Sequence, residues 1–212
     1  MIIAIDGPSA AGKSTIAKLL AKELGVEYID TGAMYRAVAL KATREGIDTD
    51  DEESLAAFLN DTDVDLSGAR VLLDGEDVAG LIRTEEVSME ASRISAIPVV
   101  RQKLVALQRE MGERKSVVMD GRDIGSNVFP GAEYKFFITA SPEVRAERRL
   151  KELSERGENV SYDEVLADVK KRDWDDSNRP LNPLVQTEDA ILIVTDNIGI
   201  EEVLQNTLKY LK

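Results

Sequence analysis

The chain carries the run Gly7-Pro8-Ser9-Ala10-Ala11-Gly12-Lys13-Ser14 close to its start. This run fits the pattern G-x-x-x-x-G-K-[ST] without a mismatch. Residues 1–5 before it read as a buried strand, and residues 15–24 after it have the apolar spacing of a helix. A strand, a glycine-containing loop and a helix in this order are the context of a phosphate-binding loop, or P-loop, so the sequence predicts one here.

The residue types in this loop explain how it would bind phosphate. Its glycines let the backbone wrap so that N–H groups point at phosphate oxygens, and the helix that follows adds the positive end of its dipole. Lys13 is expected to reach the β- and γ-phosphates of a nucleoside triphosphate, and the Ser14 hydroxyl to bind Mg²⁺. The residues expected to contact the triphosphate are Gly7, Pro8, Ser9, Ala10, Ala11, Gly12, Lys13, Ser14 and Thr15.

Length and composition limit the class of protein. A chain of 212 residues is long enough for one substantial core. A net charge of −13 excludes a general basic surface, so we expect no nucleic acid and no membrane as partner. The absence of cysteine and histidine excludes disulfides, thiolate or imidazole metal sites and histidine acid–base catalysis. Because no targeting segment, membrane span or large apolar face is evident, we expect a cytoplasmic monomer.

Apolar strands and helical patterns alternate along the rest of the chain. Further strands are predicted at 26–29, 116–119, 134–138 and 190–194. Helices are predicted at about 15–24, 33–44, 93–113, 142–155, 161–175 and 199–211. This alternation predicts an α/β fold with a five-stranded parallel sheet and helices on both faces. The polar motifs that follow the strands are then expected to meet at one edge of the sheet.

Two segments do not follow that alternation. Residues 62–82 contain strand-like stretches with turns at Ser67-Gly68 and Asp74-Gly75, which predicts a small antiparallel element. Residues from about 145 to 180 read as a pair of charged helices. Neither segment fits the parallel sheet.

Three further polar motifs lie beyond the P-loop. They are Asp30-Thr31-Gly32-Ala33-Met34-Tyr35-Arg36, Asp120-Gly121-Arg122-Asp123 and the segment from Arg172 to Arg179. Together with the P-loop, they resemble the motifs of the bacterial cytidylate kinases, which are nucleoside monophosphate (NMP) kinases. The segments that carry the resemblance are, in order, IDGPSAAGKST, DTGAMYRA, EDV-x5-R from Glu76 to Arg83, DGRDIG-x3-FP and RDWDDSNRP. They span nearly the whole chain, and the second and fourth together are far more specific than a P-loop alone.

The resemblance implies a fold and a reaction. The fold is the three-layer α/β fold of the P-loop NTP hydrolases, as a single kinase domain over residues 1–212. An NMP-binding region over 31–92 would contain the insertion at about 62–82, and residues 145–180 would form a mobile helical lid. The implied reaction transfers the γ-phosphoryl group of ATP to CMP and dCMP, with Mg²⁺, and gives CDP and dCDP plus ADP.

The resemblance also implies a binding site for CMP. Its residues would be Thr31, Tyr35, Arg36, Ser92, Arg101, Arg122, Asp123, Arg172, Asp176 and Arg179. Because cytosine presents an amino donor at N4, the carboxylate of Asp123 could accept from it and would repel the oxygen of uracil. Arg101 would donate to O2 and N3 of the same base.

The remaining members of this set would bind the sugar and the phosphate. Asp176 would accept from the ribose hydroxyls, with Arg172 beside it. Arg36, Arg122 and Arg179 would bind the CMP phosphate, because guanidinium forks match phosphate oxygens. Tyr35 could instead be a core residue whose hydroxyl finds a partner.

A phosphate acceptor makes a general base unnecessary, since its second pKa is about 6 and it is mostly dianionic at pH 7. Catalysis then rests on in-line positioning and charge neutralisation. The residues expected to provide it are Lys13, Arg122, Arg179, Arg148 and Arg149. Mg²⁺ is expected on Ser14 and, through a water, on Asp120, unless Asp120 only caps a turn.

The two lid arginines have an alternative explanation. Arg145, Arg148 and Arg149 share one helix face through their i, i+3 and i+4 spacing. Arg148 and Arg149 could cover the transferring phosphoryl group when the lid closes and excludes water. They could also pair with Glu152 or Glu155 along their own helix.

Other classes of P-loop protein fit part of the sequence. A kinase of another nucleoside monophosphate or of a small hydroxyl compound is one, and for a hydroxyl acceptor Asp123 or Asp30 could act as the base. A GTP-dependent switch would need the motif N-K-x-D for guanine, which the chain lacks. A nucleic-acid-dependent ATPase is disfavoured by the charge of −13 and the few aromatic residues.

Overall fold

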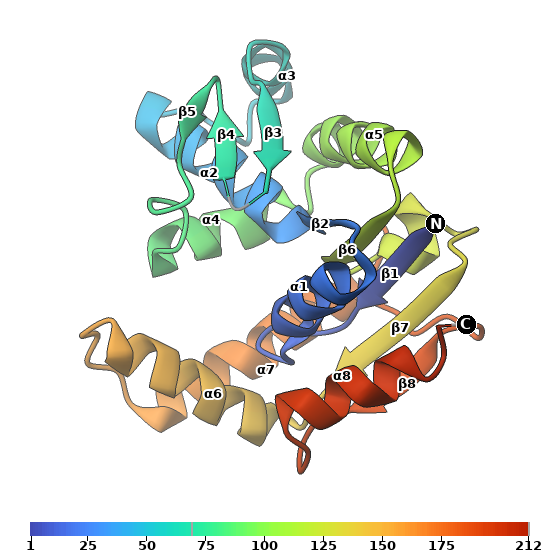
Figure 1. The fold of residues 1–212 in the computed structure, drawn as a ribbon. Coiled ribbons are helices and arrows are strands. Elements are labelled where there is room, and N and C mark those ends of the chain that lie inside the picture. The colour runs from blue at the N-terminus through green and yellow to red at the C-terminus, as the bar shows by residue number, and fades with distance from the viewer. Residues whose placement is uncertain (69, 212) are drawn as a thin grey trace. The chain divides into compact units, whose positions relative to one another are not determined.

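The protein structure is a computed structural model that describes residues 1–68 and 70–211 (Figure 1). The chain divides into two units, one of residues 1–26 and 117–212 and one of residues 27–116. The second unit is therefore inserted into the sequence of the first.

Four strands of a parallel sheet belong to the first unit. Strand β1 (Ile2–Asp6) pairs in parallel with β6 (Val117–Gly121) and with β7 (Tyr134–Thr139), and β7 pairs in parallel with β8 (Ile191–Val194). With β2 (Glu27–Asp30), the order of the five strands is β2-β6-β1-β7-β8. The five-stranded parallel sheet predicted from the sequence is confirmed.

The central strands form because their residues are apolar without alternation. Ile3, Ala4 and Ile5 of β1 are wholly buried, as are Val117 and Val118 of β6. A strand that is buried on both faces is typical of a parallel sheet covered by helices. The carboxyl end of β1 therefore delivers the loop that starts at Gly7 to the edge of this sheet.

Five helical segments belong to the first unit. They are α1 (Lys13–Leu24), the π-helix η1 (Ile124–Val128), α6 (Pro142–Glu155), α7 (Tyr162–Asn178) and α8 (Ile200–Leu208). Helix α1 packs against α8, and α6 packs against α7, as Figure 1 shows. Helix α7 begins with a capping box between Ser161 and Glu164. No helix among the described residues is long and apolar enough to cross a bilayer.

The second unit combines helices with a small sheet. Its helices are α2 (Thr31–Glu45), α3 (Glu52–Asn60), α4 (Glu85–Ile94) and α5 (Pro98–Arg114). Its strands β3 (Val64–Ser67), β4 (Arg70–Leu73) and β5 (Glu76–Asp77) are antiparallel and lie in the stretch where the sequence predicts them. The buried ammonium of Lys41 on α2 pairs with Asp74 in the β4–β5 turn at 2.7 Å, which holds this sheet on the helix.

Two elements differ from the sequence-based expectation. The single helix predicted over 93–113 is two helices, because the chain leaves α4 at Ser95 and α5 starts at Pro98. Proline suits the first turn of a helix, where its missing N–H costs nothing, but it cannot continue one. The π-helix at Ile124–Val128 was not predicted, since its geometry depends on a residue elsewhere in the chain, Asp6.

Candidate active site

The P-loop runs from the end of β1 into α1 with several residues at positive φ. Gly7 has φ 146°, Ala10 has φ 57° and Gly12 has φ 91°. A Cβ atom on Gly7 would lie 2.0 Å from the carbonyl oxygen of Ile138, so only glycine fits there. Ala10 is a non-glycine residue in the left-handed region, which neighbouring contacts must stabilise.

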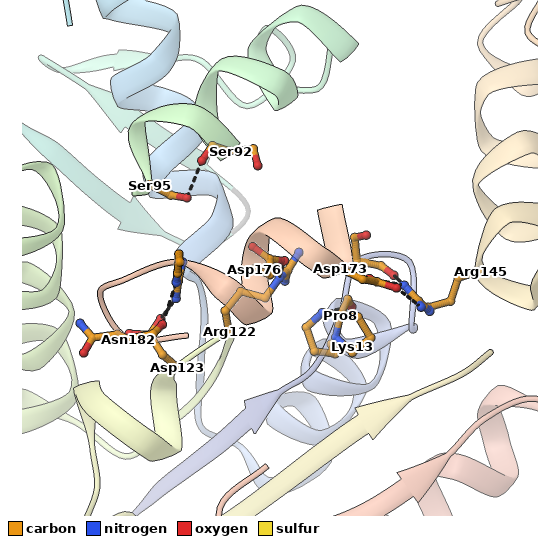
Figure 2. A network of polar contacts seen from close by, with 12 residues as sticks. Pro8, Lys13, Ser92, Ser95, Arg122, Asp123, Arg145, Asp173, Asp176 and Asn182 are labelled. Atoms are coloured by element: carbon orange, nitrogen blue, oxygen red, sulfur yellow. Dashed lines mark hydrogen bonds and ion pairs between the residues drawn. The ribbon is translucent and has the colours of Figure 1, made fainter. Parts of the chain in front are cut away.

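Lys13 lies inside the loop. Its side chain is 5% exposed, and its ammonium group donates a hydrogen bond to the carbonyl oxygen of Pro8 at 2.6 Å (Figure 2). Burial lowers the pKa of Lys13 to about 7, and the positive charge of Arg122 acts in the same direction. The negative charge of a bound polyphosphate would act in the opposite direction and favour the charged ammonium.

Two oxygen ligands suitable for Mg²⁺ lie together. The Ser14 hydroxyl donates to Oδ2 of Asp120 at 2.8 Å, and Asp120 is buried at the carboxyl end of β6. No cluster of three or more His, Cys, Asp or Glu that could hold a metal ion occurs in the described part of the chain. This donor set fits Mg²⁺, which usually takes one or two protein ligands and completes its shell with water and substrate phosphates.

Two arginine–carboxylate pairs join residues that the sequence assigned to the acceptor. Arg122 Nε donates to Oδ2 of Asp176 at 2.6 Å, and Arg179 NH2 donates to Oδ1 of Asp123 at 3.0 Å. The Asp123–Arg179 pair is almost fully buried, with side chains 8% and 6% exposed. The other carboxylate oxygen of Asp123 accepts from Asn127 at 3.0 Å. These two pairs thus join four expected acceptor residues within the first unit, of which Figure 2 labels Arg122, Asp123 and Asp176.

The pair of Arg122 and Asp176 stays ionised although burial disfavours both charges. Burial alone would raise the pKa of Asp176, but the guanidinium of Arg122 outweighs it and keeps the pKa below its usual value. Burial likewise disfavours charged Arg122, yet the carboxylate of Asp176 raises its pKa. The family resemblance implies Arg122 at the phosphate and Asp176 at the ribose, and the pairing of these two residues with each other is not predicted by the motifs.

Asp6 is a residue of this site that the sequence analysis did not assign. It is 6% exposed, and its two oxygens accept from the backbone N–H groups of Ile124 at 2.8 Å and Gly125 at 2.7 Å. Burial raises the pKa of Asp6 to about 6, although both backbone donors lower it. Asp6 therefore fixes the start of η1, directly after Asp123. Its place at a strand end beside the P-loop is the signal that could have found it.

The arginines of α6 are bound to protein groups. Arg148 donates to the carbonyl oxygen of Thr195 at 2.6 Å and to its hydroxyl at 3.0 Å. Arg149 donates to Glu152 at 2.9 Å, which is one of the pairings left open by the sequence. A role of either arginine at the transferring phosphoryl group stays a prediction. Arg172 lies in α7, one turn before Asp176.

The expected acceptor residues of the second unit form their own group. Thr31 is buried at the start of α2, where Asp30 caps the helix by accepting from Ala33 at 2.8 Å. Arg36 pairs with Asp30 at 3.2 Å, and its buried Nε makes no hydrogen bond within the described chain. That Nε is a donor that a phosphate oxygen could use.

Arg101 is the other arginine of this group, and it is buried. It is 3% exposed, lies over the ring of Tyr35 at 6.0 Å and donates to the carbonyl oxygen of Ser95 at 3.3 Å. The Ser95 hydroxyl in turn donates to the carbonyl oxygen of Ser92 at 2.8 Å (Figure 2). Tyr35 thus takes part in a cation–π contact with an expected ligand of the base.

A P-loop at the end of a central parallel strand, with a buried lysine and arginine–carboxylate pairs in the same unit, defines an α/β nucleotide-binding protein of the P-loop class. Solved structures agree on the fold. The shikimate kinase of Bacteroides thetaiotaomicron aligns over 100% of this chain and 98% of its own, with TM-score 0.52 and 16% identity. A gluconokinase from Sinorhizobium meliloti 1021 aligns over 98% and 89%, with TM-score 0.52 and 15% identity. At these identities, both show the fold alone.

Sequence comparison identifies the family. The family model for cytidylate kinase matches residues 3–212, and the chain belongs to the cytidylate kinase family. A cytidylate kinase of Caldanaerobacter subterraneus subsp. tengcongensis is 53% identical over 99% of this chain and 94% of its own. One from Clostridium botulinum (strain Langeland) is 49% identical over 99% and 97%. The resemblance predicted from the motifs is confirmed, and the protein is a nucleoside monophosphate kinase.

Proposed function

We propose that this protein transfers the γ-phosphoryl group of ATP to CMP and to dCMP, which gives CDP or dCDP and ADP. The observation that carries this proposal is the buried pair of Asp123 and Arg179 in the P-loop unit. A ligand with a phosphate and a cytosine offers an anion for the arginine and an amino donor for the carboxylate. Uracil would instead present an acceptor oxygen to Asp123.

The chemistry requires positioning more than proton transfer. The acceptor oxygen belongs to a phosphate that is mostly ionised at pH 7, so no residue has to remove a proton. Lys13 binds the β- and γ-phosphates, and Arg122 with Arg179 orients the acceptor phosphate for in-line attack. Ser14, and Asp120 through a water, would hold Mg²⁺, which would supply charge neutralisation when bound.

In this proposal, residues of the second unit also bind the acceptor. Arg36, whose side chain is 24% exposed, donates to the acceptor phosphate, and the buried guanidinium of Arg101 donates to the base. Tyr35 holds Arg101 by its ring, and Thr31 and Ser92 line the site. Asp176 and Arg172, which belong to the first unit, bind the ribose.

An acceptor panel tests the function. ADP release from ATP and Mg²⁺ is measured with CMP, dCMP, UMP, AMP, GMP, dTMP and no acceptor. We expect turnover dominated by CMP and dCMP. Turnover dominated by another acceptor would overturn the cytosine site and leave a P-loop kinase. ADP release independent of any acceptor would overturn the kinase reaction itself.

The proposal extends to the partners and the cellular location of the protein. We propose that the partners are these small nucleotides, without nucleic acid or membrane, and that the protein acts in the cytoplasm. The absence of cysteine suits a reducing compartment. Cell fractionation with an activity assay checks the location.

A further inference from the structure

A buried arginine that forms an ion pair between two helices of the first unit also contacts the P-loop. Arg145 on α6 is 3% exposed and donates to both carboxylate oxygens of Asp173 on α7, at 2.8 and 2.5 Å (Figure 2). Its remaining donors reach the carbonyl oxygen of Ala140 at 2.8 Å and that of Ser9 at 3.3 Å. One guanidinium therefore connects α7, the end of β7 and the P-loop.

The hydrogen bond from Arg145 to the Ser9 carbonyl fixes the orientation of the peptide group between Ser9 and Ala10. A trans peptide is planar, so its C=O and the following N–H point in opposite directions. Because the Ser9 carbonyl faces Arg145, the N–H of Ala10 faces the other way. Ala10 has φ 57°, which is unfavourable for alanine and needs such outside contacts.

The carbonyl group two residues further is held in the same manner. The carbonyl oxygen of Ala11 accepts from the Thr195 hydroxyl at 3.3 Å and from Arg148 at 3.5 Å. The N–H of Gly12 is therefore also directed away from α6. Arg145 and Arg148 are one helical turn apart, so a single helix holds two carbonyl groups of the loop from outside.

We propose that Arg145, oriented by Asp173, is a positioning residue that holds the P-loop in its phosphate-binding shape and makes ATP affinity depend on helix α7. A bidentate guanidinium–carboxylate pair fixes the plane of the arginine, and that plane decides whether Ser9 is reached. Helix α7 also carries Asp176, an expected acceptor ligand. The inference rests on the proposed function only for the identity of the triphosphate.

The test is ATP binding by the Asp173→Asn variant, measured by calorimetry with Mg²⁺ and no acceptor. The substitution keeps size but removes the charge that orients Arg145. We expect the Kd for ATP to rise roughly tenfold, the size of one charge-assisted hydrogen bond. A second variant, Arg145→Lys, has one ammonium that cannot bind Asp173 bidentately and also reach Ser9. It should weaken ATP binding to a similar extent.

Lys170→Gln is the matched control. Lys170 pairs with Glu143 at 3.4 Å across the same two helices, but both side chains are about half exposed and neither donates to the P-loop. We expect its Kd for ATP to stay within about twofold of the wild type, as for an exposed pair. The amide NMR signals of Ala10 and Gly12 should shift in Asp173→Asn and stay in place in Lys170→Gln.

Two results would overturn the proposal. One is an unchanged Kd for ATP in folded Asp173→Asn or Arg145→Lys. The other is an equal weakening of ATP and CMP affinity with unmoved Ala10 and Gly12 signals, which would mean general loosening. Because no acceptor turnover enters these measurements, failure of the CMP reaction in the acceptor panel would be a separate result.

Discussion

At the scale of single residues, the site is built from carboxylates and guanidinium groups that neutralise one another. Asp123 is held by Arg179 and Asn127, so its carboxylate stays fixed and oriented inside the protein. A fixed carboxylate can discriminate between bases because it cannot turn away from an unsuitable one. This property predicts how a neutral substitute would behave.

Asp123→Asn should weaken the preference for CMP over UMP by about tenfold, because an amide can donate to the uracil oxygen that a carboxylate repels. The measurement is the ratio of kcat/KM for the two acceptors. The Kd for ATP, measured without acceptor, serves as the control and should remain unchanged. If the CMP preference survives in the variant, Asp123 is not the residue that reads the base.

Asp6 predicts a pH-dependent stability. Its pKa is about 6 in the folded protein against 3.8 as its reference value, so the folded state binds the proton more tightly. This contribution to the free energy of unfolding is present below about pH 4 and is lost as the pH rises to about 6. The loss amounts to about 3 kcal/mol.

Asp6→Asn should remove that component. Urea denaturation at several pH values would then show the stability of the wild type falling relative to the variant between about pH 4 and pH 6. The nearby charges of Asp123 and Lys13 are present in both proteins and serve as the common background. Parallel stability curves for the two proteins would contradict the assignment.

At the scale of elements, the loop between β1 and α1 depends on one close approach. A Cβ at Gly7 would meet the Ile138 carbonyl oxygen at 2.0 Å, whereas a Cβ at Gly25, the C-cap of α1, meets nothing within 4 Å. We expect Gly7→Ala to lower the free energy of unfolding by about 3 kcal/mol or more and to abolish ATP binding.

Gly25→Ala is the control for backbone strain, since Gly25 has φ 64° but open space around it. This substitution should lower the free energy of unfolding by about 1 kcal/mol and leave ATP binding intact. Thermal unfolding and ATP titration of both variants measure the difference. Equal losses in the two variants would mean that the contact with Ile138 does not restrict the loop.

Which elements could be predicted from the sequence depends on how local their causes are. The P-loop and the five strands follow from short patterns, so the sequence located them. The break at Pro98 was missed because the apolar spacing continues across it. The Asp6 contact to Ile124 joins residues 118 positions apart, and the Arg122–Asp176 pair joins residues 54 apart, so no local pattern reports them. The family motifs predicted site residues, but not the contacts that these residues make with one another.

At the scale of the whole molecule, two features have opposite effects on association between copies: an apolar sheet edge favours it, and the net charge opposes it. Strand β8 is an outer strand of the sheet, and its Leu192 and Val194 are about half exposed, as is Tyr210 beyond α8. Such an edge could associate with another copy. The net charge of −13 opposes association by repulsion between copies.

We therefore expect a monomer, with repulsion strongest at low salt. Light scattering coupled to size exclusion at low and high salt measures the mass. A dimer at low salt would contradict this expectation. Association only at high salt would identify the apolar edge as its cause if Leu192→Lys prevents it.

The position of β1 in the sheet has a consequence for how the chain folds as it is made. Strand β1 is synthesised well before its partners β6 and β7, which begin at Val117 and Tyr134. The pairs of β1 therefore cannot form until the inserted residues 27–116 and both partner strands have left the ribosome. Pairing at such sequence separation is slow, and until then Ile2–Ile5 stays an exposed apolar segment for chaperones to bind.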